Sequence, residues 1–121
     1  MSGLLKQEEL EKYGLSKEVL LSKFNAQLFR DFEMCSVDSY LKPIQDFSFE
    51  KVQQNIYSAL KSISSSGAGK IHELIYRIDI SDKQYAEAVS KNRERDNLDV
   101  LSELIIKRIL QKVILKLLYS K

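Results

Sequence analysis

The stretch SSSGAGKI at residues 64–71 has the composition of a phosphate-binding loop. Nucleotide-binding loops follow the pattern G-x-x-x-x-G-K-[S/T], in which backbone amides and the lysine hold the phosphates. Gly69 and Lys70 fit this pattern, but Ser64 replaces its first glycine and Ile71 replaces the Mg²⁺-binding hydroxyl residue. The stretch also follows a helical pattern, whereas a phosphate-binding loop follows a buried strand. We therefore interpret it as a turn between two helices, with Lys70 at the surface.

Metal chemistry lacks a second ligand in the sequence, and nucleophilic catalysis would require Cys35 and His72 to meet in space. The chain contains one histidine, His72, and one cysteine, Cys35. His72 and Glu73 match the start of the zinc motif H-E-x-x-H, but Tyr76 occupies the position of the second histidine. Cys35 lies on an apolar helical stripe, where a cysteine is usually part of the core. We expect no enzymatic activity, no metal site and no cofactor.

Apolar residues recur at steps of three and four along most of the chain, which is the spacing of amphipathic helices. This spacing predicts a short polar helix at 4–13 and further helices at 21–35, 49–63, 71–78, 85–89 and 98–119. The phrase IYRIDI at 75–80 alternates like a strand when taken alone, but the longer frame favours a helix.

Serine residues precede three of these helices and can cap their first turns. Ser16 and Ser48 are candidate N-caps, and Ser81 with Gln84 forms a candidate capping box. Pro43 disfavours helical geometry at the residue before it, so the longest connection is expected there. Gly67 and Gly69 are expected to reverse the chain, so that the helices at 49–63 and 71–78 pack as neighbours. On the first helix, Asp31 is among the polar residues expected to point away from the core.

The final predicted helix is apolar on nearly all sides. Such a helix is normally enclosed, here either by the other helices or by a second copy of the chain. The candidate interface residues on this helix are Leu101, Ile105, Ile109, Leu110, Val113 and Leu117. The sequence leaves open whether they are buried within one chain or between chains.

Charge is unevenly distributed, although the formal net charge is only +2. Residues 1–50 carry a net charge of −3, whereas residues 104–121 carry five basic residues and no acid. The basic end can lie against the acidic front half of its own chain, or face an acidic partner, nucleic acid or a membrane surface. A single cysteine, the absence of a signal-peptide pattern and the absence of a long apolar run together favour a cytoplasmic protein without a transmembrane segment.

Two short helical patterns around a tight turn at 71–89 are loosely similar to a helix-turn-helix, and this raises nucleic-acid binding as an alternative function. The candidate contacts are the basic residues Lys83, Lys91, Arg93 and Arg95. Acidic residues are interspersed among them, and acids repel phosphate. Association with a membrane surface through the basic, apolar C-terminal helix is a third and less favoured hypothesis.

Two phrases in the last fifty residues resemble a group of small uncharacterised bacterial proteins. The group shares an L-[IL]-Y-R-I-D phrase, here Leu74 to Asp79, and a C-terminal helix with the core L-[AS]-[ED]-L-I-[IL]-x-R, here Leu101 to Arg108. The resemblance implies that the architecture recurs in other proteins. It implies no activity and no site residues.

These observations predict one all-α domain over residues 1–121, with residues 1–15 packed only loosely. The domain is expected to be a compact bundle of four to six helices around a largely buried C-terminal helix. We expect a non-catalytic protein–protein interaction module that self-associates through that helix. Its partner is then a second copy or another protein.

Overall fold

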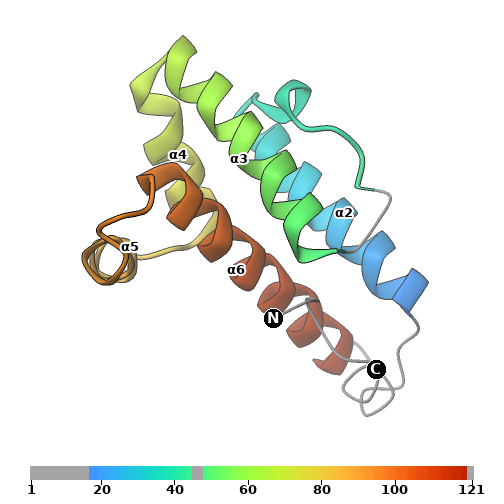
Figure 1. Ribbon diagram of the computed structural model, residues 1–121. Coiled ribbons are helices and arrows are strands. Elements are labelled where there is room, and N and C mark those ends of the chain that lie inside the picture. The colour runs from blue at the N-terminus through green and yellow to red at the C-terminus, as the bar shows by residue number, and fades with distance from the viewer. Residues whose placement is uncertain (1–16, 45–47, 120–121) are drawn as a thin grey trace.

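The computed structural model describes residues 17–44 and 48–119, which form five α-helices, one 3-10 helix and no strand (Figure 1). The elements are α2 (Lys17–Met34), η1 (Asp38–Tyr40), α3 (Phe49–Ser66), α4 (Ala68–Ile78), α5 (Asp82–Lys91) and α6 (Asn97–Tyr119). The prediction of an all-α bundle of four to six helices is confirmed. The predicted helix at 4–13 and the Ser16 cap lie outside the described residues.

The C-terminal helix α6 is the central element, because it contacts α2, α3, α4 and α5 (Figure 1). It runs antiparallel to α2. Lys112 of α6 bonds to Asp31 of α2, and Lys116, one turn later in α6, bonds to Gln27, one turn earlier in α2. Eight residues of α6 are buried. The predicted burial of the C-terminal helix is therefore confirmed.

The apolar stripes predicted on the first two described helices form most of the remaining core. On α3 the buried residues are Val52, Ile56, Ala59, Leu60 and Ile63, all at the predicted spacing. On α2 the stripe is centred on Leu20, Phe24, Leu28 and Phe32, with Leu21 only partly buried at its edge. Each buried aliphatic or aromatic side chain contributes about 1.5–3 kcal/mol of burial free energy, so these two stripes account for much of the fold's stability.

Side-chain caps begin three of the helices. Ser48 Oγ accepts a hydrogen bond from the Lys51 N–H at 3.3 Å, which starts α3. Ser81 and Gln84 form the predicted capping box of α5, with both hydrogen bonds at 3.0 Å. The Leu98 N–H donates to the Asp96 carboxylate at 2.8 Å at the start of α6. These contacts satisfy amide groups that have no partner within the helix.

The junction between α3 and α4 differs from the predicted two-glycine turn. α4 already begins at Ala68, so Gly69 lies in its first turn and the chain reverses at Gly67 alone. Gly67 has an extended backbone, with φ 171°, and donates its N–H to the Ile63 carbonyl at 3.1 Å. The prediction that the two helices pack as neighbours is confirmed by the contacts between α3 and α4.

Candidate functional site

Most of the predicted interface residues of α6 are buried within their own chain. Leu101, Ile105, Ile109, Leu110 and Val113 are buried members of the core, and Leu117 is partly buried against it. The helices α2, α3 and α4 pack around this part of α6, and their apolar stripes cover it. This corrects the expectation that these residues form an interface, because five of the six have no surface to offer to another chain.

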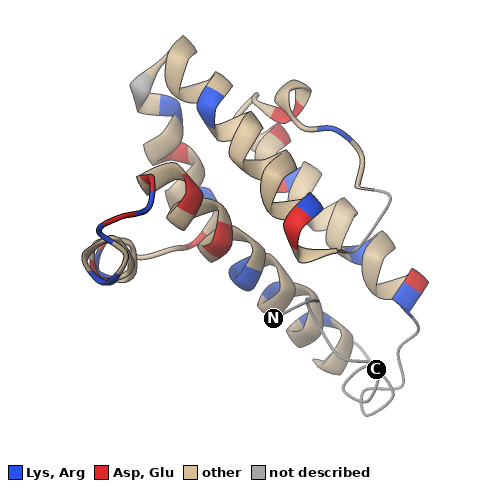
Figure 2. Cartoon of the chain, viewed as in Figure 1, with Lys and Arg blue, Asp and Glu red and all other residues tan. Residues whose placement is uncertain are grey.

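The last two turns of α6 present a different apolar face, which is exposed. Leu115 and Leu118 are each 42% exposed and Tyr119 is 83% exposed. Their spacing of three and four residues places them on one side of the helix. We call Leu115, Leu118 and Tyr119 the α6-end surface. Further back on the same side of the helix, Arg108 and Gln111 are polar. Figure 2 shows acidic residues near the start of α6 and basic residues further along it.

Three basic residues of α6 already have acidic partners within the chain. Lys107 Nζ lies 3.3 Å from a Glu103 carboxylate oxygen, and Arg108 Nη2 lies 2.8 Å from an Asp79 oxygen. Lys112 Nζ lies 2.9 Å from Asp31, which belongs to the acidic front half of the sequence. Much of the positive charge near the C-terminus is therefore balanced inside the molecule.

Asp31 is a buried carboxylate at the meeting point of three helices. It is 1% exposed and accepts hydrogen bonds from Lys112 of α6 at 2.9 Å and from Gln27 of α2 at 3.2 Å. Arg77 Nε of α4 lies 3.6 Å away. The prediction that Asp31 points away from the core is wrong. The signal that could have revealed it is its spacing of three residues after Leu28, which places it at the edge of the buried stripe.

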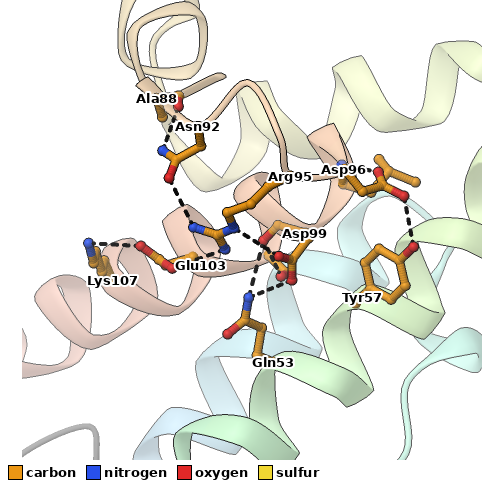
Figure 3. A network of polar contacts seen from close by, with 11 residues as sticks. Gln53, Tyr57, Ala88, Asn92, Arg95, Asp96, Asp99, Glu103 and Lys107 are labelled. Carbon is orange, nitrogen blue, oxygen red and sulfur yellow. Dashed lines mark hydrogen bonds and ion pairs between the residues drawn. The ribbon is translucent and has the colours of Figure 1, made fainter. Parts of the chain in front are cut away.

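Arg95, a candidate nucleic-acid contact, is held in an ion-pair network at the start of α6 (Figure 3). Its Nε lies 2.9 Å from Asp99 and its Nη2 lies 3.2 Å from Glu103. Gln53 of α3 donates to the same Asp99 carboxylate at 2.6 Å. The network therefore ties the α5–α6 connection and the first turns of α6 to α3.

The other three candidate nucleic-acid contacts are exposed and separate from this network. Lys83 and Lys91 lie near opposite ends of α5, and Arg93 lies in the connection that follows. Acidic residues accompany them, with Asp82 and Glu87 on the same short helix. The guanidinium of Arg95, in contrast, is neutralised by two carboxylates. The four basic residues thus do not form one basic surface.

Asp96 and Tyr57 form a second polar contact between the same two regions (Figure 3). The Tyr57 hydroxyl donates to the Asp96 carboxylate at 2.8 Å. The Leu98 N–H and then the Tyr57 hydroxyl hold the pKa of Asp96 below its ordinary value. The same hydrogen bond is the main cause of the raised pKa of Tyr57. The two hydrogen bonds therefore join the cap of α6 to α3.

Lys70 of the glycine-containing stretch makes contacts within the chain. Its Nζ donates to the Cys35 carbonyl at 3.3 Å and lies 3.4 Å from a Glu73 oxygen, while half of the side chain remains exposed. Cys35 is buried, and that burial is the main cause of the raised pKa of its thiol. His72 is exposed. Lys70 therefore links α4 to the end of α2.

Comparison with known proteins gives no assignment: no family model, curated protein or solved structure matches the chain. Among the described residues, no group of three histidine, cysteine or acidic side chains is placed to hold a metal ion. Within the same ranges, no helix is both long enough and apolar enough to cross a membrane. Any proposal about function therefore depends on the surfaces and contacts described above.

Proposed function

We propose that the protein is a non-catalytic interaction module that self-associates through the α6-end surface. The observation that supports this is the exposure of Leu115, Leu118 and Tyr119 on one side of the last two turns of α6. Apolar side chains gathered on one face gain free energy when a partner removes them from water, by about 25 cal/mol for each Å² buried. The sequence predicted an interface in the middle of α6, whereas the proposed interface lies at the end of this helix.

The charges of α6 are compatible with a second copy of the chain as the partner. Two copies that meet through α6 bring two basic segments together, which would be unfavourable if their charges were unbalanced. Lys107, Arg108 and Lys112 are paired with acids of their own chain, so this repulsion is reduced. In an antiparallel, two-fold arrangement, the apolar end of each α6 lies on that of the other copy.

The association is expected to be weak. Three exposed side chains on two turns of helix bury far less than the roughly 1,200–2,000 Å² of a stable protein–protein interface. Interfaces below about 1,200 Å² are typical of weak, transient association. A monomer–dimer equilibrium is therefore expected at high protein concentration.

Sedimentation equilibrium over a wide concentration range tests this proposal. The double variant Leu115→Glu and Leu118→Glu should abolish self-association, because it places four carboxylates in the interface of the two-fold dimer. The matched control is Met34→Glu with Tyr76→Glu, which charges two exposed apolar residues on other helices. This control should self-associate like the natural chain, and circular dichroism should show that both variants fold.

Three results would overturn the proposal. One is a pure monomer at millimolar concentration, and another is a dimer that survives the α6-end double variant. The third is binding of the monomer to anionic vesicles that the same variant abolishes, which would favour the membrane hypothesis. The nucleic-acid hypothesis would gain support only from a salt-dependent shift of DNA that Lys83→Gln with Arg93→Gln removes.

A further inference from the structure

Helix α5 is the least buried α-helix in the part of the chain that the structure describes. Each of the other four α-helices buries at least three apolar side chains, whereas α5 buries none. Its least exposed side chains, Tyr85, Ala88 and Val89, are only partly buried, and α6 is the helix that it contacts most. Figure 1 shows α5 at the edge of the bundle, with a connection at each end. Few buried apolar contacts are typical of segments that open locally while the rest of a protein stays folded.

Polar contacts do not compensate for this lack of burial. Ser81 and Gln84 form the capping box at the start of α5, and the Asn92 side chain donates to the Ala88 carbonyl at 2.7 Å near its end. Both contacts are local. Among the described residues, no side chain of α5 forms a hydrogen bond or an ion pair with another helix. A hollow of about 320 Å³ beside Gln84 and Leu104 shows that α5 does not pack fully against α6.

Ion pairs with α6 hold the chain on both sides of α5. Before this helix, the Asp79 carboxylate lies 2.8 Å from Arg108 Nη2. After it, Arg95 Nε lies 2.9 Å from Asp99, and Arg95 Nη2 lies 3.2 Å from Glu103 (Figure 3). The loosely packed helix therefore lies between two points at which the chain is attached to α6.

We infer that α5 opens and closes on α6 as one local unit while the other helices stay folded. Opening exposes no fully buried side chain of α5 and breaks no hydrogen bond from its side chains to another described helix. The ion pairs of Asp79 and Arg95 limit the opening, because they keep both ends of α5 beside α6. The open state widens the hollow that Leu104 and Lys107 of α6 line. This motion is separate from the α6-end surface and does not depend on self-association.

Native-state hydrogen exchange in low concentrations of urea tests the inference. The amides of residues 85–91 are expected to share one opening equilibrium. Their protection should be at least about tenfold lower than that in the middle of α3, and it should depend less on urea because opening exposes little surface. A value shared along α5 indicates that the whole helix opens at once.

Two variants test the role of the ion pairs. Arg95→Gln removes the attachment after α5 and should lower the protection of these amides by about threefold or more, with little change in α3. Asp79→Asn removes the attachment before α5 and should lower it by about twofold, since this carboxylate is 77% exposed. Asp79 has a φ of 72°, a conformation that asparagine also tolerates, so this variant removes the charge without straining the turn.

The matched control is Arg93→Gln, which removes an exposed arginine from the same connection and should leave the exchange of α5 unchanged. The inference is overturned if the α5 amides show the same protection and urea dependence as those of α3, because α5 would then open only with the whole fold. Protection that falls steadily from the middle of α5 to its ends would also overturn it, since the helix would then fray residue by residue. An effect of Arg95→Gln no larger than that of Arg93→Gln would contradict the role of the ion pairs.

Discussion

At the scale of single residues, Asp31 shows how one buried charge can define the arrangement of three helices. A carboxylate removed from water is tolerated only where positive and hydrogen-bonding groups compensate it. Here Lys112 comes from α6, Arg77 from α4 and Gln27 from its own helix. A shift of α6 along its axis would remove Lys112 from the carboxylate, and a shift of α4 would remove Arg77.

Replacement of this carboxylate, Asp31→Asn, is expected to destabilise the fold by about 2–3 kcal/mol. The loss is smaller than the roughly 3–5 kcal/mol of a fully enclosed pair, since the Arg77 side chain is 41% exposed and that of Lys112 is 15% exposed. Urea denaturation followed by circular dichroism measures the change in the free energy of unfolding. Glu33→Gln, which removes an exposed carboxylate from the same helix, is the control and should have little effect. Equal effects in the two variants would contradict the role of Asp31.

The lowered pKa of Asp96 predicts how the stability of the fold depends on pH. Its pKa is lower in the folded chain than the ordinary value of 3.8, so as pH falls the unfolded chain binds this proton first. Asp96 therefore stabilises the fold above pH 3.8, and this contribution is lost as pH falls through the lower folded-state pKa. Tyr57→Phe removes one of its two hydrogen bonds and should raise the pKa of Asp96 towards the ordinary value.

Carboxyl-carbon NMR titration measures this pKa directly. Tyr76→Phe removes a hydroxyl from an exposed tyrosine of α4 and should leave the Asp96 titration unchanged. An unchanged pKa in Tyr57→Phe would show that the tertiary hydrogen bond does not hold the cap.

At the scale of elements, α5 differs from the other helices because it buries no residue completely. We therefore expect the capping box to contribute more to the stability of α5 than a cap contributes to a helix with buried residues. Ser81→Ala removes one cap hydrogen bond and should cost about 1 kcal/mol of local stability. Hydrogen exchange should then become faster in α5, with little change in α3. Ser90→Ala, near the other end of the same helix, is the matched control, and equal acceleration in both variants would contradict the role of the cap.

The sequence predicts individual helices better than it predicts what covers them. The spacing of apolar residues identified α3 and α6, and Ser48 and Ser81 identified two helix starts, because caps and stripes depend on neighbours in the sequence. Periodicity cannot tell whether a buried residue such as Ile105 is covered by its own chain or by another. The Asp31 cluster brings together residues that are distant in the sequence, so it has no local signature.

At the scale of the whole molecule, the described helices enclose the middle of α6 and leave one side of its end exposed. The apolar surplus of this helix thus has two parts, one that forms the core and one that faces solvent. We relate the first part to the fold and propose the second as the surface of self-association. The central claim is therefore that copies of the chain contact each other at the α6-end surface.

Isotope-filtered NMR on an equal mixture of labelled and unlabelled chain tests this claim most directly, because it detects only contacts between copies. The account predicts intermolecular contacts from the methyl groups of Leu115 and Leu118 and from the ring of Tyr119. These contacts should grow with protein concentration. The absence of such contacts at millimolar concentration, or their presence only at other surfaces such as α5, would contradict the account.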